Sequence, residues 1–211
     1  MNHIFDFFIG PYQDRSWLLI SLEAAAFFFG IVSVMYAKKE NILVYPTGLV
    51  ATILTTYILF LDRLYGDMMM NFYFSIMSIY GWWNWMRVKE RKEKVVVISR
   101  TTLREKKIGF GMFVLTMLVT YLVYKGFGAT IEASNYIDIF TSGVFFTAMW
   151  YMANKKLENW TLWIFADLIT VPLYASRGWG MFSLQYLLFT ILAIQGYLEW
   201  KKSIDKNLQT L

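Results

Sequence analysis

The chain has 211 residues, of which 57% are hydrophobic and 17% charged, with a formal net charge of +5. Soluble domains carry about a quarter charged residues, and here the apolar residues form long runs, so the composition excludes a soluble protein and predicts a multi-spanning helical membrane protein. Because there is no cysteine and His3 is the one histidine, the sequence also excludes disulfides, thiol chemistry, a histidine-built metal site and a His-based catalytic triad.

Seven apolar segments follow one another along the chain, separated by polar breaks. Each is long enough, some of them only just, to cross about 30 Å of hydrocarbon as a helix. We predict membrane-spanning helices at residues 17–36, 41–61, 68–86, 108–124, 137–152, 160–175 and 181–200. The predicted fold class is an all-α membrane protein, with residues 1–211 in a single transmembrane domain.

The basic residues predict the orientation in the membrane. Under strict alternation of the seven spans, four of the 20 Lys and Arg residues fall at one set of helix ends and 16 at the other. Cytoplasmic loops carry the excess of Lys and Arg, so we expect the N-terminus outside and the C-terminus inside the cell. These residues then face lipid headgroups, and we expect no nucleic-acid partner. The charged stretch at residues 87–107 is predicted to be a solvated cytoplasmic connector.

An internal repeat divides the spans into groups. Residues 74–85 match residues 189–200 at a spacing of 115, and the same spacing sets Glu23 against Asp138. The match predicts a three-one-three layout, in which residues 17–86 and 137–200 are three-helix repeats and residues 108–124 are a linker helix. Because the linker brings the chain back, both repeats run in the same direction. In such parallel repeats the substrate site lies between the repeats, near the midplane of the membrane.

The sixth span carries a carboxylate near its middle. Asp167 lies seven residues beyond Trp160, roughly 10 Å deeper at about 1.5 Å per residue. An ionisable group at that depth costs about 3 kcal/mol or more unless it faces a cavity or a partner. Trp160, Trp163 and Asp167 share one helix face, and two indoles with one anion suit a flat cationic ligand. We predict that all three bind substrate; the alternatives are an interface anchor for Trp160 and a structural carboxylate for Asp167.

Five further polar side chains within the spans are candidate substrate contacts: Gln185, Tyr186, Gln195, Asn71 and Tyr80. Amides and hydroxyls in lipid need hydrogen-bond partners, so each could instead join two helices.

Three other residues are assigned to gating or structure. Glu23 and Asp138 occupy equivalent places near the outer ends of the two repeats, which favours a scaffold or gating role, with a proton relay as the alternative. Pro172 has no N–H, so it is predicted to kink the sixth span beside the site.

Three motifs in order resemble the Pnu family of bacterial vitamin transporters, and within it the PnuC branch. They are Ile-Tyr-Gly-Trp-Trp-Asn-Trp at residues 79–85, Glu-Asn-Trp-Thr-Leu-Trp at residues 158–163 and Ser-Leu-Gln-Tyr at residues 183–186. The resemblance covers residues 17–200 and implies a fold similar to the SWEET sugar transporters. It implies facilitated uptake of unphosphorylated nicotinamide riboside across the inner membrane, trapping by a cytoplasmic vitamin kinase, and a homotrimer in the lipid bilayer. We expect no cofactor, metal or enzyme activity.

The resemblance also bears on the substrate. It makes Trp160 and Trp163 the aromatic walls of the site, and the family pattern after them often reads Trp-x-x-x-Asn, where this chain has Asp167. A carboxylate favours a positively charged ligand more than an amide does. Both nicotinamide riboside and thiamine are cations, so thiamine, another B vitamin or a nucleoside remains an alternative substrate. A membrane vitamin sensor is a remoter alternative. The sequence contains no Gly-rich phosphate loop, so nothing in it indicates coupling to ATP. Coupling to protons stays open.

Overall fold

The computed structural model describes residues 8, 10–13, 15–62, 65–87, 96–126, 133–178 and 180–209. Within them the chain forms a short 3-10 turn and seven long helices: η1 (Gly10–Tyr12), α2 (Trp17–Lys38), α3 (Val44–Leu61), α4 (Tyr65–Met86), α5 (Leu103–Gly126), α6 (Ala133–Ala153), α7 (Glu158–Ser176) and α8 (Gly180–Gln209). Each predicted span overlaps one of these helices along most of its length, so the all-α fold class is confirmed.

Four of the helices, α2, α3, α5 and α8, are long and apolar enough to cross a membrane by length and composition. On α5 the side chains of Leu115, Leu118 and Leu122 are each more than half exposed, as expected for a surface that lipid covers. The helices α4, α6 and α7 are richer in polar residues, and several of these, such as Asn71 and Asp167, face the interior of the bundle.

Local hydrogen bonds account for two of the helix starts. The Ser16 hydroxyl caps α2 by accepting a hydrogen bond from the Leu19 N–H at 3.3 Å. Helix α3 begins at Val44, later than the predicted residue 41, because Asn41 Oδ1 accepts a hydrogen bond from the Leu43 N–H at 2.9 Å and holds a turn instead.

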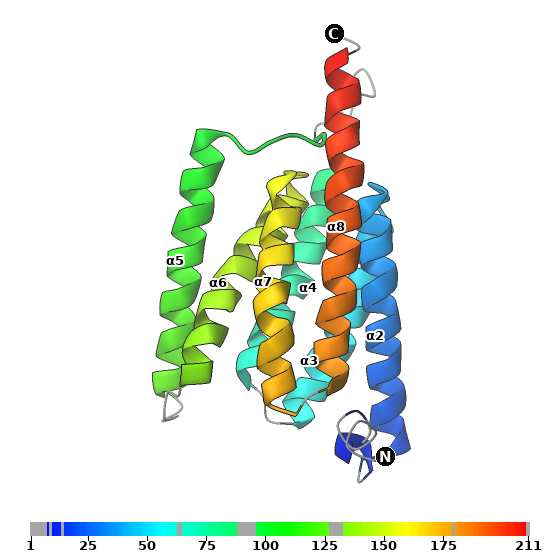
Figure 1. The fold of residues 1–211 in the computed structure, drawn as a ribbon, viewed down its shortest axis with the longest axis vertical. Coiled ribbons are helices and arrows are strands. Elements are labelled where there is room, and N and C mark those ends of the chain that lie inside the picture. The colour runs from blue at the N-terminus through cyan, green and yellow to red at the C-terminus, as the bar shows by residue number, and fades with distance from the viewer. Residues whose placement is uncertain are drawn as a thin grey trace.

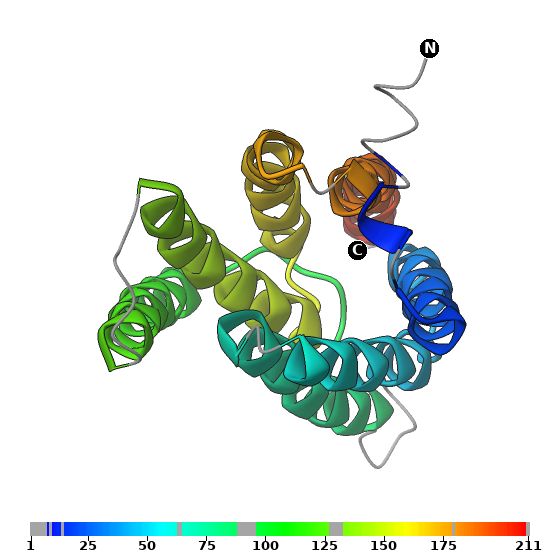
Figure 2. The ribbon, with the colours of Figure 1, turned by 90° about the horizontal axis from the view of Figure 1, so that it is seen from below.

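Six helices form a closed ring. Packing contacts join α2 to α3, α3 to α4, α4 to α6, α6 to α7, α7 to α8 and α8 back to α2. Helix α5 lies outside the ring and packs mainly on α6, as the view along the helices shows (Figure 2). Successive helices run in alternate directions, so α2 begins at one end of the bundle and α8 finishes at the other (Figure 1). In this ring α3 and α7 stand opposite each other, with two helices between them on either side.

The main hydrophobic core lies at the end of the ring where α2 ends and α3 begins. Its largest buried side chains are four aromatic residues, Tyr45, Trp85, Trp160 and Trp200. A smaller cluster around Phe145 of α6 packs against Trp163 further along the ring.

The prediction of a solvated connector at residues 87–107 is wrong for Ile98, whereas Arg100, Arg104, Lys106 and Lys107 are exposed; residues 88–95 lie outside the described part. Ile98 is 8% exposed and belongs to the main core. The Ser99 N–H donates to the Lys155 carbonyl at 3.1 Å, and the Leu157 N–H donates to the Ser99 carbonyl at 2.9 Å. These bonds fix the segment before α5 to the turn between α6 and α7.

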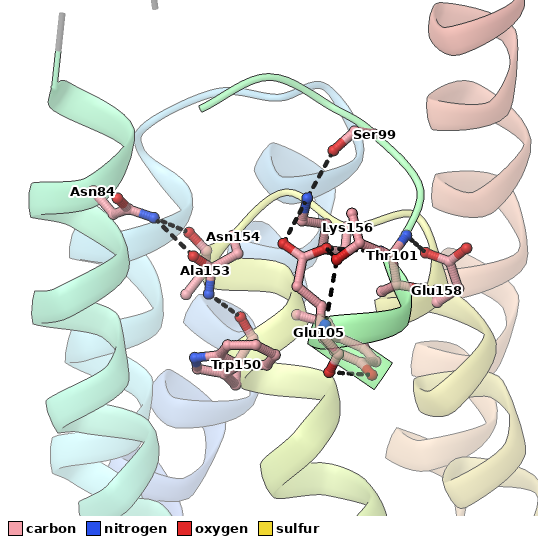
Figure 3. A network of polar contacts seen from close by, with 11 residues as sticks. Asn84, Ser99, Thr101, Glu105, Trp150, Ala153, Asn154, Lys156 and Glu158 are labelled. Atoms are coloured by element: carbon pink, nitrogen blue, oxygen red, sulfur yellow. Dashed lines mark hydrogen bonds and ion pairs between the residues drawn. The ribbon is translucent and has the colours of Figure 1, made fainter. Parts of the chain in front are cut away.

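Side chains reinforce this attachment (Figure 3). Lys156 Nζ lies 3.0 Å from Ser99 Oγ and 2.9 Å from Glu105 Oε1. The Thr101 N–H donates to Glu158 Oε2 at 2.8 Å. Ser99, Thr101 and Glu105 of the connector therefore bind to charged residues of the turn between α6 and α7 and the start of α7, which the sequence did not predict.

Candidate functional site

The ring of helices encloses a cavity of about 1190 Å³. Side chains from all six ring helices line it, and none from the described part of α5 does. It extends from a mouth, where Arg15, Asp62 and Asp138 lie, to a floor formed by Tyr45 and Trp160. This volume is somewhat larger than the roughly 300–1000 Å³ of typical ligand pockets, so the cavity has room for a small organic ligand.

The cavity brings together six of the eight predicted substrate contacts: Asn71, Trp160, Trp163, Asp167, Gln185 and Tyr186. They come from α4, α7 and α8, which are far apart in the sequence.

The other two, Tyr80 and Gln195, do not line the cavity. Each lies two residues beyond a lining residue, Ser78 or Ala193. Two residues turn a helix by about 200°, so their side chains leave the opposite face. Gln195 Oε1 accepts a hydrogen bond from Lys38 Nζ at 2.7 Å on the outside of the ring.

Glu23 and Asp138 both line the cavity near its mouth, and each forms an ion pair with an arginine. Arg15 Nη2 lies 2.6 Å from Glu23 Oε1, and Arg177 Nη2 lies 2.6 Å from Asp138 Oδ2. Although burial opposes the charge on Arg177, its hydrogen bond to Asp138 and the attraction of that carboxylate raise its pKa above the ordinary value.

Pro172, the third residue assigned to gating or structure, is exposed and does not line the cavity. Helix α7 continues through it from Glu158 to Ser176. We leave Pro172, Tyr80 and Gln195 out of the site proposed below.

Asp167 is buried in the cavity wall, and no ion pair between described residues includes it. Its side chain is 1% exposed, and its Oδ1 accepts no hydrogen bond from any residue in the described part of the chain. The neighbouring wall is aromatic: Trp163 and Phe145 have ring centroids 5.4 Å apart, and Phe145 and Tyr186 are 6.0 Å apart. Burying a carboxylate in such surroundings costs several kcal/mol unless a cation or hydrogen-bond donor reaches it. No described residue fills that role.

Tyr45 and Trp160 form the floor at positions related by the repeat spacing of 115. Both are almost completely buried, and neither Tyr45 Oη nor Trp160 Nε1 has a hydrogen-bond partner among the described residues. Each packs on a glycine of the next helix: a Cβ at Gly196 would lie 2.6 Å from the Trp160 ring, and one at Gly81 would overlap the Tyr45 ring. Sequence reasoning missed Tyr45, although the repeat would have identified it as the counterpart of Trp160.

The cavity is acidic, in contrast to the chain as a whole. Among the described residues, five carboxylates and one guanidinium line it, and no lysine does: Glu23, Asp62, Asp67, Asp138 and Asp167, with Arg15. A cavity of this sign concentrates cations and repels anions such as phosphates. Sequence reasoning also missed Asp67, which lies one residue before the predicted start of the third span.

Comparisons with known proteins identify the family and the fold. The model of a family described as nicotinamide mononucleotide transporter matches residues 20–202. The nicotinamide riboside transporter PnuC of Escherichia coli (strain K12) is 26% identical over 212 residues, which cover 90% of this chain and 87% of that protein. PnuC of Neisseria mucosa is 26% identical over 209 residues, covering 93% and 76%.

Two further similarities are more distant. The riboflavin/roseoflavin transporter RibM of Streptomyces davaonensis is 22% identical over 124 residues, covering 58% of each chain. The crystal structure of the vitamin B3 transporter PnuC matches with a TM-score of 0.72 at 23% identity, covering 94% of this chain and 86% of that chain. At this level of identity the structural match establishes a shared fold.

Proposed function

This chain belongs to the family of nicotinamide mononucleotide transporters, the PnuC family, and from that premise we propose that it carries unphosphorylated nicotinamide riboside across the bacterial inner membrane by facilitated diffusion. It is a multi-pass membrane protein and a transporter, not an enzyme. Trapping by a cytoplasmic vitamin kinase, a role in NAD biosynthesis and assembly as a homotrimer are the further parts of the proposal that the family resemblance implies.

One observation supports a flat, cationic vitamin as the substrate. Asp167 is 1% exposed and faces the cavity, with Trp163 on the same face of α7 and no counter-charge among the described ion pairs. The pyridinium of nicotinamide riboside supplies both a positive charge for the carboxylate and a flat ring for the indole. An acidic cavity also favours the unphosphorylated form, because a phosphate would bring negative charge next to the carboxylates.

The packing of the helices supports the three-one-three layout as the basis of transport. The first helix of each half packs on the third helix of the other half, α2 on α8 and α6 on α4. This is the pattern expected for two parallel repeats, residues 17–86 and 137–200, related by an axis along the membrane normal, with residues 108–124 as linker. With the N-terminus outside and the C-terminus inside, the mouth of the cavity faces outward.

Thiamine is the second candidate substrate, because its thiazolium would satisfy Asp167 equally well. Titration of the purified protein with both vitamins decides between them, and tighter binding of thiamine would overturn the first choice. Uptake of labelled nicotinamide riboside into proteoliposomes then tests transport itself. Binding without uptake would indicate a vitamin sensor.

A further inference from the structure

Several residues that line the cavity occupy equivalent positions in the two repeats. On α3 the lining residues Thr52 and Thr55 correspond, at a spacing of 115, to Asp167 and Thr170 of α7, which also line it. The correspondence also holds for Tyr45 with Trp160 at the floor and for Leu59 with Tyr174 further along the walls. Because α3 and α7 stand opposite each other in the ring, equivalent positions form two facing walls.

The two walls differ in chemistry. The α7 wall presents the Trp163 indole and the Asp167 carboxylate at positions where the α3 wall presents Gly48 and the Thr52 hydroxyl. The α3 wall between its ends therefore contains neither a charge nor a ring. A ligand that fills the space between these walls meets an anionic aromatic surface on one side and a neutral hydroxyl-bearing surface on the other.

The hydroxyls of the α3 wall retain capacity to accept hydrogen bonds. Thr55 Oγ1 donates to the Ala51 carbonyl at 2.9 Å, and Thr52 Oγ1 donates to the Leu49 carbonyl at 3.2 Å while accepting from Ser75 Oγ at 2.7 Å. A hydroxyl has one hydrogen and two lone pairs, so Thr55 keeps two free lone pairs and Thr52 one. Both side chains are partly exposed.

An amide on α4 extends the same surface. Asn71 Nδ2 donates to the Asp67 carbonyl at 3.0 Å, which leaves the side-chain oxygen of Asn71 as a further acceptor beside the cavity. Acceptors of this kind suit a ligand group that carries several hydroxyl donors, as a sugar does.

We propose that Thr55, Thr52 and Asn71 form a sugar subsite that accepts hydrogen bonds from the ribosyl hydroxyls, while the cationic ring lies against Trp163 and Asp167. The inference rests on the proposed function and deepens it, since it assigns each part of the substrate to one wall. It makes the α3 wall the element that selects a ribosylated cation over one that lacks a sugar.

The test compares two ligands that share a ring. Nicotinamide riboside and 1-methylnicotinamide both carry the pyridinium, but the second has a methyl group on the ring nitrogen in place of the sugar. Replacing Thr55 by Val removes the hydroxyl, and we expect it to weaken binding of nicotinamide riboside about fivefold, the effect of one hydrogen bond. Binding of 1-methylnicotinamide should stay unchanged, so the ratio of the two dissociation constants reports the subsite.

Thr56→Val is the matched control. Thr56 is the next residue on α3 and donates to the Thr52 carbonyl at 2.6 Å, but it does not line the cavity, so its loss should leave both ligands unaffected. Thr55→Ser keeps the hydroxyl and should bind both ligands as the unsubstituted protein does. Thr55→Ala provides the same comparison if the valine variant does not fold.

Two results would overturn the sugar subsite: equal weakening of both ligands by Thr55→Val, or no weakening of either. These results are distinct from failure of the proposed function. If the unsubstituted protein binds nicotinamide riboside but Thr55→Val retains full affinity, only the subsite is wrong. If the unsubstituted protein binds no nicotinamide riboside at all, the function is wrong.

Discussion

Asp167 shows how one residue can define the chemistry of this cavity. Its carboxylate lies among the rings of Trp163, Phe145 and Tyr186, at a position where the family motif often has asparagine. An amide there would accept and donate hydrogen bonds without charge. A carboxylate with no partner among the described residues instead lowers stability, and under the proposed function part of that cost is recovered when a cationic substrate binds.

The variant Asp167→Asn tests this role. We expect binding of nicotinamide riboside to weaken at least tenfold, because a charge-assisted contact is worth about 1.5–3 kcal/mol. The thermal unfolding midpoint should stay equal or rise, since an unpaired buried charge is removed. Titration calorimetry and a thermal unfolding curve provide the two measurements. Unchanged affinity in a folded variant would make Asp167 part of the scaffold.

At the scale of helices, the floor of the cavity contains the same aromatic arrangement twice. Tyr45 and Trp85 have centroids 5.1 Å apart and planes at 86°, and Trp160 and Trp200 have centroids 5.4 Å apart and planes at 86°. The Trp85 indole donates to the Ala153 carbonyl at 3.2 Å, and the Trp200 indole donates to the Ala37 carbonyl at 3.1 Å. The third helix of each half is thereby bonded to the first helix of the other half.

We predict that these indole hydrogen bonds hold the floor closed. Trp200→Phe keeps an aromatic ring but removes the donor, so α8 loses its bond to the Ala37 carbonyl. That carbonyl still accepts from the Glu40 N–H at 3.0 Å, so the expected cost is that of one hydrogen bond, about 0.5–1.5 kcal/mol. The closed floor should then open more often, and a cysteine at Ala193 should react faster with an impermeant maleimide added at that side. Because the chain has no cysteine, the labelling has no background.

Two further variants make this labelling experiment decisive. Trp85→Phe should have the same effect as Trp200→Phe, since its indole makes the equivalent bond. Trp83→Phe is the control, because Trp83 is 54% exposed on the same helix as Trp85 and belongs to neither arrangement. Equal labelling in all three variants would show that the indole bonds do not control access.

In the molecule as a whole, the ion pairs differ between the two ends of the cavity. At the mouth, Arg15 with Glu23 and Arg177 with Asp138 each join residues of one half. At the floor, Lys155 Nζ of the second half lies 2.5 Å from Glu40 Oε1 of the first half and 4.4 Å from the Trp85 ring centroid. The described ion pairs that join the two halves therefore lie at the floor, whereas those at the mouth stay within one half.

The pair between Glu40 and Lys155 can be tested by reversal. Glu40→Gln leaves the nearly buried ammonium of Lys155 without this carboxylate. We expect it to lower the unfolding free energy by about 1–3 kcal/mol, less than for a fully buried pair because Glu40 is partly exposed. The exchanged double variant Glu40→Lys with Lys155→Glu should recover part of that loss in thermal unfolding. No recovery would mean that the two residues act independently.

Much of the site was readable from the sequence because helical periodicity places Trp160, Trp163 and Asp167 on one face. The same periodicity could not show whether Tyr80 and Gln195 face the cavity. They lie on equivalent faces of α4 and α8, but those faces turn away from the cavity. The rotation of each helix about its axis depends on packing against neighbours, here on the glycines that receive Tyr45 and Trp160.

The sequence by itself determined the membrane class, the places of the helices and the 115-residue repeat, because hydropathy and local periodicity act within single segments. Only the tertiary structure decided which six helices close into a ring, which faces point inward, and that Tyr45, Thr55 and Asp67 line the same cavity as Asp167. These features depend on contacts between segments that are distant in the sequence. The free energy of such a contact depends on both segments, so it cannot be read from either one alone.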